Sequence, residues 1–337
     1  MDPVLKRKWP RSDLETSVMG FGAAPIGNFF RPISDDESAS LVKAAWEAGV
    51  RYFDTAPSYG HGLSEARCGQ SLRWYPREDF VLSTKVGRLL KPRRRSEINF
   101  KPWVDGLPFE WHFDYSYDGA MRSIEDSLQR MGLEHVDIAL IHEVDEYTHG
   151  SRQPEVFEVA MSGAAKALLR LREEGVIKAI GVGVNECSVA QAAIERIDFD
   201  CVLLAGRYTL LEQDALDSFL PMCIQKQVSV IVGGGYNSGI LATGATPTAK
   251  YNYAPATEPI LERVRRIERV CAKYNVPLKS AAMHFILAHP AIPTVIPGVR
   301  SVAQLNENLS TFRAEIPKDF WSELRSMELI RPDAPTP

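Results

Sequence analysis

The octapeptide FDTAPSYG, Phe53–Gly60, follows an apolar run and joins a carboxylate, Asp54, to a phenol, Tyr59, five residues later. Two further polar groups also end apolar, strand-like runs: Lys85 in FVLSTKVG and His142 in VDIALIHEV. The strands of a (β/α)8 barrel bring such residues together at its C-terminal face, where these barrels carry their chemistry. The stretch therefore predicts a barrel with an acid, a phenol, an amine and an imidazole at one mouth.

Eight short apolar runs follow one another along the chain, and most are continuously apolar rather than alternating. Strands that are covered on both faces have this pattern, which is typical of a parallel sheet wrapped by helices. The expected strands are 18–23, 51–56, 80–86, 136–143, 177–184, 201–206, 228–234 and 293–298.

Segments with helical spacing separate nearly all of these runs. Ser34 and Glu37 form a capping box that opens a helix over 35–48, and Gly175 follows a longer helix as a C-cap. Eight β-α repeats without a change in composition predict one barrel, a single domain over residues 1–337. A doubly wound sheet is the alternative, but no GxGxxG follows the first strand. The other expected helices are 64–73, 117–131, 155–174, 188–196, 214–226, 258–274 and 301–312.

Two additions enlarge the barrel beyond its usual length of roughly 250 residues. The first is a loop at 88–116, after the third strand, that is rich in Trp, Phe, Tyr and Pro. An aromatic loop at this face predicts one wall of a substrate pocket, although it could instead bury its own small core. The second is a tail from Pro317 that predicts an amphipathic helix covering the mouth or the bottom of the barrel.

The composition is that of an ordinary globular protein, with 45% hydrophobic and 24% charged residues. A net charge of −4 gives no sign of a nucleic acid or a membrane surface as partner, and we interpret the basic cluster 91–95 as a solvated loop. We expect no signal peptide and no membrane span. Five scattered cysteines without a CxxC favour a reducing cytoplasm over disulfides or a zinc site.

Each of the four strand-end residues also has an ordinary structural interpretation. Asp54 could cap a turn, and Tyr59 could be a surface aromatic. Lys85 could reach solvent or form a Schiff base, and His142 could be a satisfied core histidine. The coincidence of all four at one barrel face favours joint catalysis. A lysine near the phenol would favour its ionised form, and so lower a pKa that is ordinarily about 10.

These four residues, together with IPGVRSVAQLNENL at 296–309, resemble the aldo-keto reductase superfamily. The resemblance covers about residues 14–312. Several segments resemble the bacterial aldose 1-dehydrogenase and pyridoxal 4-dehydrogenase group, among them FDYSYDGAMRSIEDSLQRMGL, AIGVGVNE, DCVLLAGRYTLLEQ and YNSGILATG. The resemblance implies an enzyme in which Tyr59 is the general acid/base, Lys85 lowers its pKa, Asp54 holds Lys85 and His142 orients the substrate oxygen.

The resemblance also implies a nicotinamide cofactor across strands 5 to 8. Asn185 would donate to the carboxamide, although Gly183 and Val184 stand where relatives have a Ser-Asn pair. Gly233 stands where many relatives have a tyrosine that stacks on the nicotinamide, so stacking must come from elsewhere or be absent. The pyrophosphate would be wrapped by the loop after strand 7 through Asn237, Ser238, Gly239 and main-chain amides up to Leu241.

The last strand bears on the choice between NAD and NADP. Relatives that prefer NADP have a lysine and an arginine where this chain has Gly298 and Gln304, so the sequence favours NAD. Arg300 remains nearby and could still pair with a phosphate. Glu307 and Asn308 keep the pattern expected on the adenosine side.

The predicted activity is oxidation of a cyclic hemiacetal to a lactone in the cytoplasm, by a monomer or homodimer. The substrate would be an aldose such as L-fucose, D-arabinose or L-galactose. Pyridoxal is the alternative, because it also forms a cyclic hemiacetal with a ring carbon that carries H and OH beside a ring oxygen. A general NADPH-dependent aldehyde reductase, a cofactor-binding regulatory subunit and a Schiff-base aldolase using Lys85 are further alternatives. We expect Trp111, His112 and Arg207 to contact the substrate.

Overall fold

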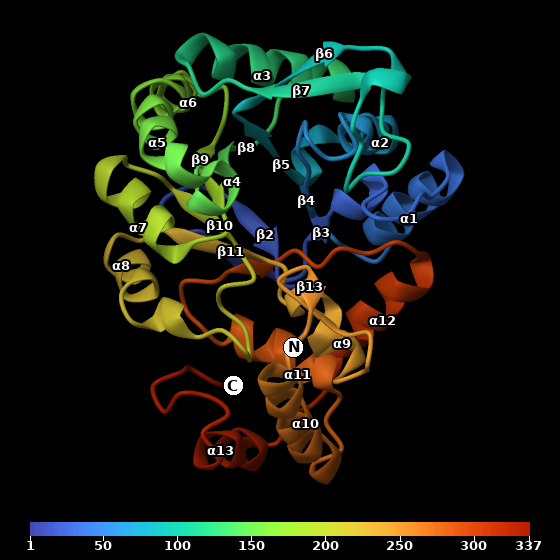
Figure 1. Cartoon of the computed structure of the whole chain (residues 1–337), viewed down its shortest axis with the longest axis vertical. Helices are drawn as coiled ribbons and strands as arrows, with labels where there is room; N and C mark the ends of the chain where they lie inside the picture. Colours follow the sequence, from blue (N-terminus) through green and yellow to red (C-terminus); the bar gives the residue numbers. More distant parts are fainter.

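The computed structural model describes residues 1–337 and contains the predicted barrel (Figure 1). Eight parallel strands pair in chain order. Single parallel bridges, Met19 with Val295 and Gly22 with Gly298, join the first strand to the last and close the ring. The strands are β3 (Phe21–Gly22), β4 (Tyr52–Asp54), β5 (Val81–Val86), β8 (Ile138–His142), β9 (Ala179–Val184), β10 (Cys201–Ala205), β11 (Ser229–Gly233) and β14 (Thr294–Val295).

A short N-terminal hairpin closes the bottom of the barrel, a feature that the sequence did not predict. Its strands are β1 (Lys6–Lys8) and β2 (Glu15–Ser17), which pair antiparallel. Trp9 and Leu14 from this hairpin join a buried cluster with Tyr52 and Ile138, which begin two barrel strands. The indole of Trp9 donates to Thr16 Oγ1 over 3.0 Å. The barrel interior is therefore a packed core that is open only at its C-terminal face.

Helices form the outer layer, and most lie where the spacing predicted them. The capping box of Ser34 and Glu37 is present, and Gly132 in the left-handed region ends the third long helix. The outer helices are α1 (Asp35–Glu47), α2 (Leu63–Leu72), α3 (Tyr117–Met131), α5 (Gln153–Ser162), α6 (Ala164–Glu173), α7 (Cys187–Arg196), α8 (Phe219–Gln225), α10 (Glu258–Lys273), α11 (Leu278–Leu287) and α12 (Val302–Arg313).

Three features of the helical layer differ from the prediction, and the first is that the helix expected over 214–226 divides into η5 (Asp214–Leu216) and α8. The helix expected over 155–174 is broken at Gly163, where the next amide, that of Ala164, donates to the carbonyl of Tyr115 instead of continuing the helix. The helix α11 was missed because nearly all of its side chains are buried, including the run Ser280–Leu287, so its sequence has no polar face. A helix that is apolar all round has no amphipathic period for sequence analysis to detect.

The insertion at 88–116 is a β-hairpin with a long tip rather than an irregular loop. Its strands are β6 (Arg88–Pro92) and β7 (Phe109–Phe113), and they pair antiparallel with Arg88 opposite Phe113. Figure 1 shows this hairpin at the edge of the barrel between α2 and α3. Gly87, with φ of 105°, makes the turn from β5 into the insertion against the ring of Tyr115.

The C-terminal tail contains the predicted helix, α13 (Lys318–Ser326), but this helix covers neither end of the barrel. Phe320 packs edge-on against Tyr274 of the α10 segment, and Trp321 lies near Phe285 of α11, so the tail adds to the helical layer. No helix is long and apolar enough to cross a membrane. The short elements are η1 (Ala24–Gly27), η2 (Arg77–Asp79), η3 (Arg95–Glu97), α4 (Glu146–His149), η4 (Gly150–Arg152), η5 (Asp214–Leu216), η6 (Asn237–Gly239), α9 (Ile240–Thr243), β12 (Lys250–Tyr251) and β13 (Ala254–Pro255).

Candidate active site

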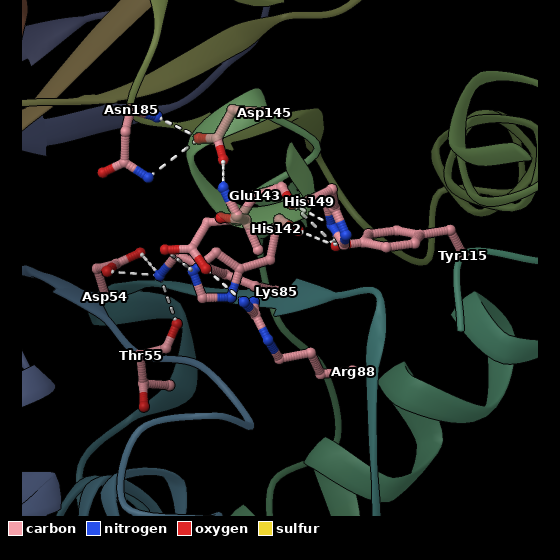
Figure 2. Close-up of polar contacts among 11 residues, drawn as sticks. Asp54, Thr55, Lys85, Arg88, Tyr115, His142, Glu143, Asp145, His149 and Asn185 are labelled. Atoms are coloured by element: carbon pink, nitrogen blue, oxygen red, sulfur yellow. Dashed lines mark hydrogen bonds and ion pairs between the residues drawn. The ribbon is translucent and has the colours of Figure 1, made fainter. Parts of the chain in front are cut away.

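A buried ion pair lies at the C-terminal ends of β4 and β5. Lys85 Nζ donates to both carboxylate oxygens of Asp54 over 2.8 and 3.0 Å and to the carbonyl of Thr55 over 2.8 Å (Figure 2). Ser83 Oγ adds a hydrogen bond of 2.7 Å to Asp54. Burial alone would lower the pKa of Lys85, but the Asp54 carboxylate and the Tyr59 phenol together raise it above the usual value. Lys85 is therefore a fixed cation.

This geometry bears on the Schiff-base alternative. A lysine nucleophile needs a neutral amine with a free lone pair, and its pKa is usually depressed for that purpose. Lys85 Nζ donates to both carboxylate oxygens of Asp54 and to the carbonyl of Thr55, and its pKa is raised rather than lowered. The arrangement disfavours an aldolase mechanism at this residue.

Tyr59 lies in the turn after β4, with its ring centroid 4.7 Å from Lys85 Nζ and 6.0 Å from the ring of His142. Trp103, from the tip of the insertion, packs 5.4 Å away on a tilted plane. Burial raises the pKa of Tyr59 to about 12, and the charge of Lys85 opposes that rise without overcoming it. Lys85 therefore lowers the pKa of Tyr59 as expected, but it does not bring that pKa below the ordinary value in the free protein. Burial raises the pKa by more than the ammonium group of Lys85 lowers it, and the Asp54 carboxylate adds to the rise.

His142 ends β8 with only 6% of its surface exposed. Burial, followed by the nearby cations Arg88 and Lys85, lowers its pKa well below the usual value. The imidazole is therefore neutral at physiological pH. A neutral imidazole can donate a hydrogen bond to a substrate oxygen, and its lowered pKa makes it a weak base that does not take the proton in place of Tyr59.

Two adjoining cavities meet at Tyr59, and both are also lined by Phe29, Tyr147, Asn185 and Tyr253. The first has walls of bare backbone at the ends of several barrel strands, from Gly22, Gly206, Gly233, Gly234 and Gly298. The second is largely aromatic and charged, with Phe30, Trp103 and Trp111 beside Arg88, Lys101, His142 and Glu143. The glycine-walled cavity suits a long ligand held against backbone, and the aromatic cavity suits a small ring.

Part of the predicted cofactor set lines the glycine-walled cavity: Asn185, Asn237, Ser238 and Gly298. The amide of Asn185 is held by Asp145, whose carboxylate accepts from both its side chain and its backbone N–H over 3.0 and 2.8 Å (Figure 2). Asn237 accepts from Thr209 and donates to the carbonyl of Gly206, which fixes the loop after β11. The residues present therefore fit a nicotinamide dinucleotide that runs along this cavity.

The remaining predicted cofactor residues do not line this cavity. The amides of Gly239 and Leu241 are bonded to the carbonyl of Tyr236, and the Leu241 side chain is fully buried, so their contact with a cofactor stays a prediction. Arg300 Nη2 donates to the carbonyl of Phe29, while its Nη1 has no hydrogen-bond partner. The others lie on α12, where Gln304 accepts from the Arg300 amide, Glu307 pairs with Lys279, and Asn308 accepts from the Tyr236 hydroxyl.

Of the three expected substrate contacts, Trp111 lines the aromatic cavity and Arg207 lines the glycine-walled one, where it donates to the carbonyl of Asn185 over 2.7 Å. His112 lines neither cavity. It alternates with Trp111 along β7, and successive strand residues point to opposite faces, so His112 faces away from the aromatic cavity and its contact with substrate stays a prediction.

Sequence reasoning missed Arg88 and Glu143, which form an ion pair on the wall of the aromatic cavity. Arg88 follows the Lys85 strand after one glycine and Glu143 immediately follows His142, so their place beside catalytic candidates was the available signal. Sequence reasoning also missed Tyr253, at the tip of the β12–β13 hairpin, and Phe29. Because Gly233 has no side chain, these rings and Tyr147 are the aromatic groups besides Tyr59 that line both cavities. No group of His, Cys, Asp or Glu side chains is placed to hold a metal ion.

Comparison with known proteins places these features in context. The model of the aldo/keto reductase family matches residues 18–328. The chain is 41% identical to a pyridoxal 4-dehydrogenase of Microbacterium luteolum, over 96% of this chain and 98% of that protein. It is 38% identical to a D-threo-aldose 1-dehydrogenase of a Pseudomonas species, over 96% of each chain. Among solved structures, a glycerol dehydrogenase from Gluconobacter oxydans is similar with a TM-score of 0.76 and 20% identity, over 99% of this chain and 97% of that chain.

Proposed function

The chain belongs to the aldo/keto reductase family and is an oxidoreductase, and from that premise we propose that it oxidises a cyclic hemiacetal to a lactone. The observation that carries the proposal is the position of Tyr59, at the junction of a glycine-walled cavity and an aromatic cavity, with Lys85 and His142 beside it. A hemiacetal in the aromatic cavity would present its ring carbon, with H and OH, to that junction.

In the proposed reaction the hemiacetal C–H bond breaks as a hydride leaves, and the O–H proton passes to Tyr59 as the carbon–oxygen bond becomes the lactone carbonyl. A nicotinamide cofactor, when bound, supplies the acceptor for that hydride. Lys85 stabilises the phenolate that must be present to take the proton, and Asp54 keeps Lys85 in position. His142 donates a hydrogen bond that orients the substrate oxygen. Positioned acid/base catalysis of this kind contributes about 10²–10⁴-fold.

The residues that would hold the cofactor are Asn185 for the carboxamide, Asn237 and Ser238 for the pyrophosphate, and the backbone of Gly233 and Gly234 along the same cavity. We favour NAD over NADP. Gly298 and Gln304 carry no charge, Arg300 is engaged by Phe29, and the carboxylate of Glu307 lies one helical turn from Gln304. The two positions at which relatives that prefer NADP carry a cation therefore supply none here.

Replacing Gln304 by Arg tests that preference. We expect the Kd for NADPH to fall by roughly 10- to 100-fold, because a hydrogen bond to a charged group contributes about 1.5–3 kcal/mol, while the Kd for NADH stays within about twofold. Fluorescence titration of both reduced cofactors measures the two constants. Gln225→Arg, at the end of α8, is the matched control and should alter neither. Tighter binding of NADPH than of NADH by the unaltered protein would contradict the proposal.

Aldoses such as L-fucose, D-arabinose and L-galactose are the first candidate substrates, since their C1 carries the reacting fragment and the aromatic wall can stack on a sugar face. Pyridoxal is the second candidate, and the lining of the cavity specifically favours it. Trp103, Trp111 and Phe29 offer flat surfaces for a pyridine ring, and Arg88 and Lys101 add positive charge.

The deciding experiment is the initial rate of cofactor reduction with NAD and with NADP against the three sugars and pyridoxal. A preference for one sugar would establish an aldose 1-dehydrogenase, and a preference for pyridoxal would establish a pyridoxal 4-dehydrogenase. Lactone formation should be verified by mass, because an aldehyde reductase working in reverse would not give a lactone from the closed ring. No turnover of any of the four with either cofactor would refute the proposal.

A further inference from the structure

Arg88 is an almost fully buried arginine whose guanidinium is only partly paired. Its side chain is 6% exposed, and Nη2 forms an ion pair with Glu143. The other two nitrogens, Nε and Nη1, are buried and have no hydrogen-bond partner in the protein. Burying charged donors without partners is costly, so folded proteins satisfy them as a rule.

The fold satisfies a comparable arginine at another site. Arg67, which is 7% exposed, donates through Nε to Asp35, through Nη1 to the carbonyl of Ile26 and through Nη2 to the carbonyl of Ile33. Arg300 and Arg325 also leave a nitrogen unpaired, but neither lines the cavities that meet at Tyr59. Arg88 is thus the unsatisfied arginine on the wall of the aromatic cavity.

The guanidinium is held rigidly in this place. The rings of Trp111 and Phe113 lie 5.2 and 4.8 Å from its central carbon, within the range of cation–π contacts. Figure 2 shows its head group directed toward Glu143 and lying beside His142. The imidazole Nε2 of His142 is in turn 3.9 Å from Glu143 Oε1. A substrate whose reacting oxygen is held by His142 would therefore have its adjoining ring atoms close to Arg88.

We propose that Arg88 is a substrate-binding residue that donates a hydrogen bond to an electron-rich oxygen carried by the hemiacetal a few bonds from its reacting carbon. This inference rests on the proposed function and adds a specificity element to it. A guanidinium is a donor only, with a planar fork that matches an oxygen acceptor. Two ring substituents supply this chemistry: the phenolate of pyridoxal and a hydroxyl of an aldose beside the anomeric carbon.

Substrate pairs that differ by that one oxygen test the proposal. We would measure kcat/KM with NAD for pyridoxal against 3-deoxypyridoxal, and for L-fucose against 2-deoxy-L-fucose. The unaltered protein should prefer the oxygen-bearing member of one pair by roughly 10- to 100-fold, the usual effect of a hydrogen bond to a charged group. Arg88→Gln should reduce that preference to about twofold, chiefly through KM. The pair that responds identifies the source of the oxygen.

Two further variants exclude trivial causes. Arg93→Gln is the matched control, because Arg93 lies in the same insertion but is exposed and paired with Glu110 on the surface. It should keep the full preference. Arg88→Gln combined with Glu143→Gln removes the carboxylate that the single variant leaves uncompensated, so it serves if Arg88→Gln folds poorly. An equal preference in the unaltered protein and in both Arg88 variants would overturn the proposal, as would no preference in either pair.

A binding measurement separates this proposal from the proposed reaction. With NADH present, 4-pyridoxolactone and its 3-deoxy analogue are titrated against the tryptophan fluorescence of the unaltered protein and of Arg88→Gln. One outcome is that no hemiacetal is turned over but the 3-oxygen still strengthens binding only when Arg88 is present. This outcome would support Arg88 as the binding site for the oxygen and would refute the proposed reaction. Binding that is indifferent to Arg88, in a protein that forms no lactone, overturns both.

Discussion

Tyr59→Phe is expected to lower kcat for lactone formation by about 10²–10⁴-fold while leaving the affinity for cofactor within about twofold. The substitution removes only the hydroxyl, so the ring keeps its packing against Trp103 and its place above Lys85. Steady-state rates and fluorescence titration of NADH measure the two effects. Tyr75→Phe, whose ring stacks on Trp46 on the outside of the barrel, is the control and should retain activity.

The rate of the oxidation should also depend on pH in a defined direction. Since the pKa of Tyr59 is raised to about 12 in the free protein, the phenolate that accepts the proton is a minor form at neutral pH. As the pH rises toward that pKa, the fraction of phenolate increases tenfold for each pH unit, so oxidation should become faster from neutral to alkaline pH. Reduction uses the protonated phenol, so its rate should not increase over the same range. A flat profile for oxidation up to pH 10 would count against Tyr59 as the base.

Lys85→Met should abolish activity and destabilise the protein together. Met has a similar length but no charge, so Asp54 is left as an uncompensated carboxylate that is 3% exposed. Removing one partner of a buried ion pair typically costs about 3–5 kcal/mol. The loss of the ammonium also removes the group that opposes the rise in the pKa of Tyr59, so less phenolate forms. Urea unfolding and initial rates measure the two consequences.

A double variant distinguishes these two effects of Lys85. Lys85→Met with Asp54→Asn replaces the ion pair by neutral groups of similar size, so most of the lost stability should return while activity stays absent. Full activity in this double variant would show that Lys85 acts only as a structural residue. Normal stability of the single variant would show that Asp54 is not buried as strongly as the structure indicates.

Local sequence patterns were sufficient to predict the barrel because its strands are short, buried on both faces and separated by helices with recognisable caps. The parallel order of strands then forced Asp54, Lys85 and His142 to one face. Elements without a local signature were missed. The helix α11 is buried all round, and the hairpin β1–β2 is too short to show a period.

The sequence by itself thus determined the fold, the four strand-end residues and their common location, since each depends on patterns a few residues long and on one topological rule. Tertiary structure alone decided how these groups behave. The pKa of Tyr59 depends on the competition between burial and Lys85, and the neutrality of His142 depends on burial beside two cations. Arg88 reaches the cavity only because the insertion folds as a hairpin that cages it between Trp111 and Phe113. Desolvation and contacts between distant segments have no counterpart in a local pattern, so they emerge only when the chain is folded.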